Sequence, residues 1–272
     1  MKRVVSILGC GWYGLALAKS LLVQGDVVKG SVTKTEKLNL LSEYGIQPFL
    51  VDLQKISETP KADPFFDCDI LVIACNVNLA KRPNYLLEIE GLIQQVRTSL
   101  IKKVLFISSI SIYGEPGTVV DEQSLPQPNT ESARLLSAAE ALFLAETRFE
   151  VTILRFGGLV GPGRMPGRFL SGKKQIPNGL APVNLIHLKD CVGLTEAVIN
   201  SKAHIPILNG VSPAHPTRNY FYCLAAAVEK LPAPEFILEK NDWKEVNSRY
   251  GTNFYQYQIT DWKNWLLNPQ LD

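Results

Sequence analysis

At 272 residues, of which 46% are hydrophobic, the chain is long enough for one large domain with a sizeable core, and two full domains would fit poorly. The 28 Lys and Arg residues and the 26 Asp and Glu residues leave a formal net charge of +2. With charges so nearly balanced, electrostatics gives no reason to expect a nucleic acid or an acidic membrane as partner. No apolar run approaches the roughly 18 residues of a transmembrane helix, so we expect a soluble protein.

The five cysteines are scattered, and none stands in a C-x-x-C spacing. An odd number without that spacing indicates neither a disulfide framework nor a zinc site, and it fits a reducing cytoplasm. The N-terminal segment imitates a signal peptide, with a basic start, an apolar stretch and a small-residue A-x-A ending. Its glycines, however, stand at a meaningful spacing, and the segment continues directly into a strand and helix pattern, so we expect a cytoplasmic protein.

The first half of the chain alternates short apolar runs with helical patterns, which predicts parallel β-α-β units. Strands are expected at 3–8, 26–32, 47–52, 69–74, 102–108 and 150–156. Helices are expected at 12–24, 35–45, 84–101 and 131–148. The near-continuous apolar character of the fourth and fifth strands is typical of strands covered by helices on both faces. The chain should therefore form a Rossmann-type α/β fold with a doubly wound parallel sheet.

The second half of the chain is less regular. Residues 157–182 are rich in Gly and Pro and have no sustained period, which indicates a loop. Beyond it we expect an apolar segment at 183–188, a helix at 190–201, a strand at 205–211, a helix at 216–230 with Pro216 in its first turn, and a short helix at 261–267. Trp243, Trp262 and Trp265 should belong to the core of this region.

These elements suggest a division of the chain into a Rossmann core, 1–156, and a mixed region, 157–272. The mixed region completes the core at about 188–211 and forms a small C-terminal region on the substrate side.

A G-x-G-x-x-G pattern, formed by Gly9, Gly11 and Gly14, follows the first strand and opens the first helix. Gly9 permits a tight turn, Gly11 lets the backbone approach a pyrophosphate, and Gly14 lets the helix pack close to the strand. The helix N-terminus favours the negative phosphates. The pattern therefore predicts a dinucleotide site that includes Trp12 and Tyr13, with a merely structural glycine turn as the alternative.

The end of the second strand usually decides between the two nicotinamide cofactors, because an acidic residue there binds the free ribose hydroxyls and repels a 2′-phosphate. In this chain residues 30–37 read GSVTKTEK. Thr33 offers a hydroxyl and Lys34 a positive charge, with Lys37 nearby. We therefore expect NADP as cofactor, with NAD left open if the lysines are only solvated.

Further candidates for the cofactor groove stand at the carboxyl ends of the later strands. Asp52 ends the third strand and is a candidate to contact the adenine, although a loop carboxylate is commonly just a cap. Ala74, Cys75 and Asn76 end the fourth strand, and Ser108 ends the fifth. No basic residue beside Cys75 in sequence favours its thiolate, which indicates a packing residue rather than a nucleophile.

Three further stretches carry a family resemblance: S-S-x-S-x-Y-G at 108–114, L-R-x-G-G-L-x-G-P-G-R at 154–164 and N-L-I-H-L-x-D at 184–190. Together with the glycine pattern, they resemble the extended short-chain dehydrogenase/reductases, the NAD(P)-dependent epimerase/dehydratase family, whose members mostly act on nucleotide-sugars. Residues 207–236 look like the C-terminal part of the atypical, short members. The resemblance covers nearly the whole chain.

The resemblance implies a triad of Ser or Thr, Tyr and Lys, in which the tyrosine moves a proton while hydride passes to or from nicotinamide. Ser109 matches the serine. The resemblance places Tyr and Lys one turn apart on the next helix, where this chain has Ser132 and Leu136. A serine hydroxyl cannot act unaided as this base, and leucine has no charge with which to assist it.

Three interpretations of the proton transfer remain. In the first, Tyr113 or His187 substitutes for the missing tyrosine, although a pocket-shaping tyrosine and a hydrogen-bonded structural histidine are the alternatives. In the second, the Ser109 hydroxyl and cofactor positioning alone support a slower reaction. In the third, the protein is a catalytically silent NADP-binding sensor or regulator.

The leading function is that of an NAD(P)-dependent epimerase, dehydratase or reductase acting on a nucleotide-sugar or related polyol. Arg164 and Arg168, in the loop after the sixth strand, are candidates to bind a substrate diphosphate, and Ser111 is a further substrate-side candidate. A solvated loop is the alternative for the arginines. We expect a small molecule as partner, neither nucleic acid nor membrane, and a homodimer is left open.

Overall fold

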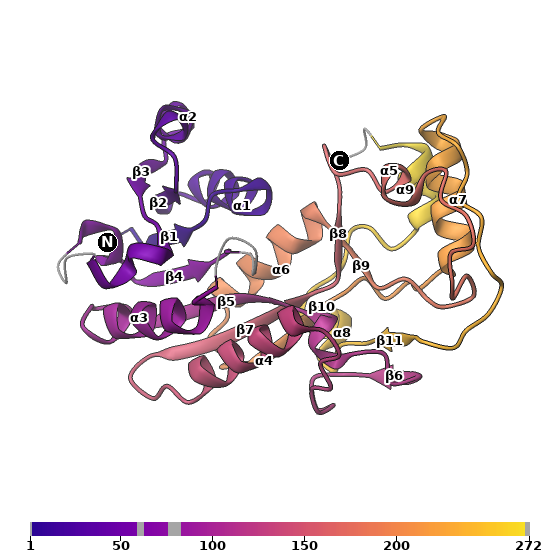
Figure 1. Ribbon diagram of the computed structural model, residues 1–272. Helices are drawn as coiled ribbons and strands as arrows, with labels where there is room; N and C mark the ends of the chain where they lie inside the picture. The colour runs from indigo at the N-terminus through magenta and orange to yellow at the C-terminus, as the bar shows by residue number, and fades with distance from the viewer. Residues whose placement is uncertain (1, 59–62, 76–82, 270–272) are drawn as a thin grey trace. The chain divides into compact units, whose positions relative to one another are not determined.

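The computed structural model of the chain describes residues 2–58, 63–75 and 83–269, and the chain forms two compact units (Figure 1). Unit 1 comprises Met1–Ser109, Thr130–Leu154 and Thr195–Leu208, and unit 2 comprises Ile110–Asn129, Arg155–Leu194 and Asn209–Asp272. Each unit is therefore built from segments that are distant in the sequence. The division of the chain at residue 156 stays a prediction.

A seven-stranded parallel sheet, with strand order β10-β7-β5-β4-β1-β2-β3, is the central feature of the fold. Its strands are β1 (Val4–Leu8), β2 (Val27–Val32), β3 (Gln47–Leu50), β4 (Ile70–Ile73), β5 (Lys103–Ser109), β7 (Glu150–Phe156) and β10 (Ile207–Gly210). All six strands expected before residue 157 are present. β1 pairs with β2 on one side and with β4 on the other, so the strand order reverses beside β1. The Rossmann-type, doubly wound α/β fold is confirmed.

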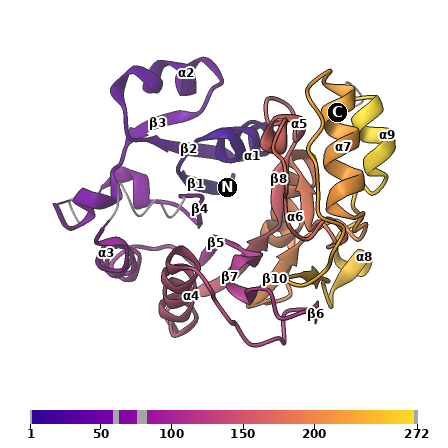
Figure 2. The same cartoon turned by 45° about the vertical axis from the view of Figure 1, so that its right-hand side comes forward.

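The helices of unit 1 follow the expected pattern. They are α1 (Trp12–Val23), α2 (Leu38–Glu43), α3 (Tyr85–Arg97) and α4 (Glu131–Leu144). Buried residues recur every three or four positions along α3, so one stripe of this helix faces the core. α3 and α4 lie side by side in both views (Figure 1, Figure 2). Short 3-10 turns accompany them at η1 (Thr35–Lys37), η2 (Leu53–Glu58) and η3 (Pro64–Phe66).

The sequence indicated a loop at residues 157–182, but the structure has short elements there. β8 (Gly158–Val160) pairs in parallel with β9 (Leu185–His187), and α5 (Gly167–Leu170) follows β8. A three-residue strand has too few residues to show a period of two, and its partner follows much later in the chain. The prediction of a loop was therefore wrong at β8 and α5.

The remaining helices are α6 (Leu188–Asn200), α7 (Arg218–Val228), α8 (Gly251–Phe254) and α9 (Trp262–Leu267), with a further 3-10 turn at η4 (Ile110–Tyr113). Pro216 was expected in the first turn of α7. It lies before the helix instead, because Thr217 is the N-cap. The Thr217 side chain accepts a hydrogen bond from the Tyr220 N–H at 3.4 Å. The hydroxyl satisfies a first-turn donor, and this places the helix start one residue beyond the proline.

The tryptophans of unit 2 divide into two groups. Trp262 and Trp265 are buried in a cluster with Val160, Val183 and Phe221, which confirms them as core residues. This cluster lies where α7 and α9 pack side by side (Figure 2). Trp243 is only half-buried, with the Lys240 ammonium 3.5 Å from its ring centroid, so the expectation of a core position was wrong for this residue.

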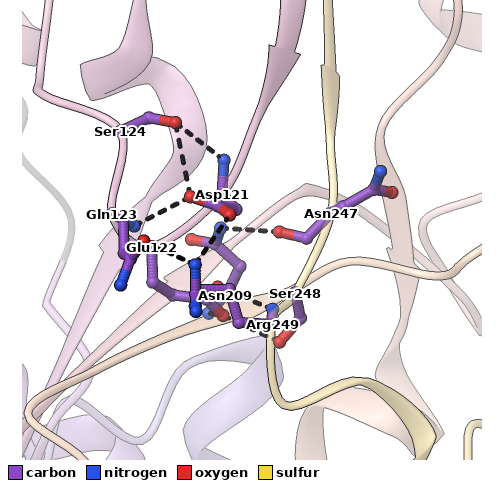
Figure 3. Close-up of polar contacts among 8 residues, drawn as sticks. All are labelled: Asp121, Glu122, Gln123, Ser124, Asn209, Asn247, Ser248 and Arg249. Carbon is purple, nitrogen blue, oxygen red and sulfur yellow. Dashed lines mark hydrogen bonds and ion pairs between the residues drawn. The ribbon is translucent and has the colours of Figure 1, made fainter.

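A second small sheet in unit 2 pairs β6 (Thr118–Val120) with β11 (Lys244–Val246). Beside it, the Glu122 carboxylate accepts hydrogen bonds from the Asn209 N–H at 2.9 Å, the Ser248 hydroxyl at 2.7 Å and the Arg249 N–H at 2.8 Å (Figure 3). The Asn209 amide donates to the Asn247 carbonyl at 2.9 Å. One carboxylate thus joins three segments of unit 2 that are far apart in sequence.

Asp190 is the most deeply buried carboxylate anchor of unit 2, with an exposed fraction of 0%. One of its oxygens accepts the Tyr255 hydroxyl at 2.9 Å and the Gln258 N–H at 2.6 Å, and the other accepts the Ile259 N–H at 3.0 Å. Burial, together with the Asp190 charge, raises the pKa of the Tyr255 phenol. The tyrosine therefore serves as a neutral donor that holds residues 255–259 against α6.

All five cysteines are free thiols. Within the residues that the structure describes, no helix combines the length and the apolar character needed to cross a membrane.

Replacing Asp190 by Asn should lower the free energy of unfolding by about 2–4 kcal/mol, because an amide nitrogen would then face a buried N–H or O–H donor. Urea denaturation measures the change. Asp261→Asn is the matched control, since Asp261 caps α9 by accepting the Asn264 N–H at 3.0 Å and asparagine caps equally well. Equal losses in the two variants would contradict the anchoring role of Asp190.

Candidate functional site

A cleft of about 380 Å³ lies in unit 1 at the carboxyl ends of β1, β2 and β3. Carboxyl ends of parallel strands beside a reversal of strand order are the usual ligand position in this architecture. The cleft is lined by Leu8, Gly9, Cys10, Gly11, Ser31, Val32, Thr33, Lys37, Val51, Asp52, Leu53, Gln54 and Cys75.

The glycine loop forms one wall of this cleft. Gly9 has a φ of +102°, and its N–H donates to the Ser31 hydroxyl at 2.9 Å. A Cβ added to Gly14 would stand 2.3 Å from the Gly9 carbonyl oxygen, so only glycine lets α1 approach β1 this closely. A Cβ on Gly11 would meet nothing within 4 Å. Open space therefore lies beside the residue expected to admit a pyrophosphate.

Gly11 is the N-cap of α1 and has no side chain to accept from the first-turn amides. The partial positive charge of this helix end therefore faces a loop without a competing carboxylate. Trp12, the first residue of α1, is half-buried. Tyr13 is buried, and its hydroxyl shares a hydrogen bond of 2.7 Å with Thr195, which gives it a structural function within unit 1.

At the end of β2 the structure separates the two lysines. Thr33 and Lys37 line the cleft. Lys34 is absent from the lining, is largely exposed and pairs with Glu36 at 3.6 Å. The lysine that lines this part of the cleft is therefore Lys37, the last residue of the η1 turn.

The candidates at the ends of β3 and β4 stand at the cleft as well. Asp52 lines it, and its carboxylate also accepts the Gln54 N–H at 3.1 Å, as a capping residue does. The Cys75 thiol donates to the Leu8 carbonyl at 3.3 Å and lines the cleft, while the Ala74 carbonyl lies close to Gly9. Asn76 lies outside the described residues. Burial raises the pKa of the neighbouring Cys10 thiol to about 12, so this thiol stays protonated at neutral pH.

The end of β5 directs its two serines to opposite faces, as alternation along a strand requires. Ser108 is buried and donates a short hydrogen bond to the Glu140 carboxylate of α4. Ser109 is half-buried. On α4, Ser132 is exposed and Leu136 is buried, with an exposed fraction of 8%. The positions that the resemblance gives to the proton-transfer pair therefore carry neither a phenol nor an ammonium group.

Tyr113 belongs to unit 2 and is buried, with an exposed fraction of 1%. Its hydroxyl accepts from the Arg155 guanidinium at 2.8 Å and donates to the Asn209 side-chain oxygen at 3.0 Å. Burial raises the pKa of this phenol, and the Arg155 charge offsets only part of the rise. These surroundings suit a structural tyrosine better than one that transfers protons at neutral pH.

His187 in β9 is also buried, and its ring packs edge-on against Trp265 with 5.0 Å between the ring centroids. Its Nδ1 accepts the Lys189 N–H at 3.2 Å, which assigns the proton of the neutral ring to Nε2. Nε2 lies close to Gly161, since a Cβ added to Gly161 would stand 3.2 Å from this nitrogen. The histidine is thus enclosed by the core of unit 2.

The three substrate-side candidates are exposed residues of unit 2. Ser111 lies in η4. Arg164 donates from Nε to the Leu159 carbonyl at 2.9 Å, and Arg168 lies 3.7 Å from the Glu229 carboxylate. Neither arginine lines the cleft of this unit that contains Asn178 and Arg218.

This polar cleft of unit 2 has a volume of about 410 Å³. The sequence did not indicate it, because its residues come from five separate segments. It is lined by Ile110, Glu115, Gly158, Asn178, Ala181, Pro182, Val183, Asn184, Leu185, Arg218, Tyr222, Asp242, Trp243 and Lys244. The only local signal was the Asn-Gly pair at 178–179, which predicts a turn and not a binding residue.

Comparison with known proteins shows a relative by sequence. Protein YeeZ of Escherichia coli strain K12 is 35% identical to the chain over 240 residues, which cover 87% of each protein. No family model matches the chain.

Solved structures are similar over almost the full length. A UDP-glucuronic acid 4-epimerase from Bacillus cereus in complex with NAD has a TM-score of 0.80 and 17% identity, covering 97% of this chain and 96% of that one. A dTDP-glucose 4,6-dehydratase from Bacillus anthracis in complex with NAD has a TM-score of 0.80 and 14% identity, covering 99% and 95%. At such low identity these likenesses show the fold.

Gly14→Ala and Gly11→Ala should separate folding from binding. The first substitution places a methyl group against the Gly9 carbonyl and should lower the free energy of unfolding by about 1–3 kcal/mol. The second meets open space and should cost less than about 1 kcal/mol, while lowering the affinity for NADPH by about tenfold or more. Urea denaturation and fluorescence titration measure the two effects. Unchanged NADPH affinity in Gly11→Ala would contradict the pyrophosphate assignment.

Proposed function

The chain belongs to the family of Protein YeeZ, and we propose that it is an atypical extended short-chain dehydrogenase/reductase of the epimerase/dehydratase type that uses NADP in hydride chemistry on a nucleotide-sugar or related polyol. The observation that carries this proposal is the cleft of unit 1. It joins the glycine loop, the N-terminus of α1 and the ends of β2 and β3 in one groove.

The residues of this cleft fit a dinucleotide. Gly14 lets α1 pack close to Gly9, and the open space at Gly11 is where we expect a pyrophosphate to approach the backbone. Asp52 lines the same cleft and is the residue we assign to the adenosine moiety. Bound NADP supplies the hydride acceptor or donor. The Bacillus cereus epimerase and the Bacillus anthracis dehydratase were solved with NAD, which supports a nicotinamide dinucleotide as the ligand class.

The preference for NADP over NAD follows from the charges at the end of β2. Residues 31–35 contain no carboxylate, and Thr33 and Lys37 line the cleft. A hydroxyl and an ammonium group are suitable partners for a 2′-phosphate. Lys37, rather than Lys34, is therefore the proposed phosphate ligand.

For the chemical step, we assign Ser109 to orient a substrate oxygen. Tyr113 and His187 remain candidates for the proton transfer, but their burial and hydrogen bonds favour functions in shaping the pocket. With Ser132 and Leu136 on α4, the step relies chiefly on the positions of cofactor and substrate. The proposed enzyme is therefore slower than one with a tyrosine and lysine pair.

Lys37→Gln should weaken the binding of NADPH by about tenfold, because it removes one charge-assisted contact to the 2′-phosphate, and should leave NADH binding unchanged. Fluorescence titration measures both affinities. Lys34→Gln should have little effect on either, since Lys34 already pairs with Glu36. A larger loss in Lys34→Gln, or tighter binding of NADH than of NADPH by the unaltered chain, would defeat the cofactor assignment.

Turnover tests the proposed reaction. NADPH absorbance is followed with a panel of nucleotide-sugars and carbonyl compounds, and product isomers are separated, since epimerisation leaves the cofactor unchanged. We expect slow turnover that rises by at least about tenfold in the double variant Ser132→Tyr with Leu136→Lys, because general acid-base catalysis contributes 10²–10⁴-fold. Ser132→Phe with Leu136→Met is the control without titratable groups. NADPH binding without turnover in any of these proteins would instead favour a silent NADP-binding regulator.

A further inference from the structure

The cleft of unit 2 contains a buried amide whose orientation is determined by its neighbours. The Asn178 side-chain oxygen accepts the Asn241 N–H at 2.8 Å and the Asp242 N–H at 3.1 Å. Two donors on one side identify that atom as the oxygen, so the NH₂ group must point the other way. Asn178 is buried, with an exposed fraction of 6%, and lines the cleft. The described residues supply no acceptor for its two N–H bonds, and because Asn178 lines the cleft, these donors are available to a ligand there.

Arg218 supplies a cation beside this amide. Its Nη1 donates to the carbonyl of Pro177, the residue before Asn178, at 2.9 Å. Its guanidinium lies over Phe236 with 5.7 Å to the ring centroid, and Phe236 stacks in turn on Tyr222. These contacts hold the guanidinium plane while its remaining N–H bonds line the cleft. No carboxylate within the described part of the chain pairs with Arg218.

The other charges of the cleft restrict the ligand. Four charged side chains line it: Glu115, Arg218, Asp242 and Lys244. Lys244 is buried, and its ammonium is already bonded to the Glu115 carboxylate and the Gly114 carbonyl, both at 2.7 Å. Arg218 is therefore the cation left for a ligand, and Asp242 adds a negative charge nearby. The lining is neutral in sum, so a ligand with several negative charges would lack partners.

We infer that Arg218 and the Asn178 amide bind a single carboxylate of the substrate, so that the substrate class is a polyol carboxylate, a sugar acid, rather than a nucleoside diphosphate sugar. A planar guanidinium edge and an adjacent NH₂ group match the two oxygens of a carboxylate. Tyr222 and Trp243, which also line the cleft, can cover the carbon chain. That the bound carboxylate belongs to the substrate rests on the proposed function, whereas the binding site itself lies within unit 2.

Isothermal titration of the full chain, without cofactor, tests the inference with gluconate, glucose, glucose 6-phosphate and UDP-glucose. Gluconate should bind at least about tenfold more tightly than glucose, and more tightly than the two phosphate compounds, because one cation faces the ligand. Arg218→Gln should weaken gluconate binding by about tenfold or more. Arg218→Lys, which keeps the charge but loses the planar donors, should give an intermediate loss.

Asn178→Asp provides a second variant, since it keeps the oxygen that accepts the two backbone N–H bonds and replaces the NH₂ by a negative oxygen. This variant should also abolish the preference for gluconate over glucose. Lys174→Gln is the matched control, because this exposed lysine pairs with Glu235 at 3.1 Å outside the cleft and its loss changes the charge equally. Gluconate binding no tighter than glucose binding, tighter binding of UDP-glucose, or full affinity in folded Arg218→Gln would each overturn the inference.

A separate NADPH titration distinguishes this inference from the proposed function. NADPH binding that persists while gluconate fails to bind rejects the carboxylate site alone. Gluconate binding without NADPH binding rejects the proposed cofactor chemistry and leaves the carboxylate site in place.

Discussion

The contact on which unit 1 depends is the approach of α1 to β1 at Gly14 and Gly9. With 2.3 Å between the Gly9 oxygen and the place of a Cβ on Gly14, any larger residue would push the helix away from the strand. The close approach sets the direction of α1, so that its N-terminus faces the groove at the ends of β1 and β2. A single steric constraint thus produces both the packing of the fold and the geometry for binding phosphates.

Unit 2 depends on buried carboxylates instead. It contains short strands and helices, such as β8, β9 and α5, which offer few backbone hydrogen bonds of their own. Asp190 and Glu122 supply the missing connections, because each accepts three hydrogen bonds from segments that are distant in sequence. A carboxylate has enough acceptor capacity to serve as such a junction, and burial makes each lost bond costly. These junctions hold the separate segments of unit 2 together.

Much of the fold was predictable, because parallel strands and their covering helices follow from local periodicity. All six early strands and the four helices of unit 1 appear close to their expected ranges. The groove residues at the strand ends, Gly9, Thr33, Asp52 and Cys75, followed from topology for the same reason. The choice between Lys34 and Lys37 did not, because it depends on how the 3-10 turn between them orients the two side chains. The predicted start of α7 at Pro216 was too early, because the Thr217 hydroxyl caps the helix and α7 begins at the next residue.

The sequence by itself determined the Rossmann-type sheet, the glycine loop and the absence of a tyrosine and lysine from α4. Each of these depends on residue identity at short spacing, where sterics and periodicity act. Only the tertiary structure decided that the Tyr113 hydroxyl is occupied by Arg155 and Asn209, and that Asn178 and Arg218 share a cleft. Those relations join residues that are far apart in the chain. Their chemistry depends on burial and on the neighbours that packing brings within hydrogen-bonding distance, which no local pattern encodes.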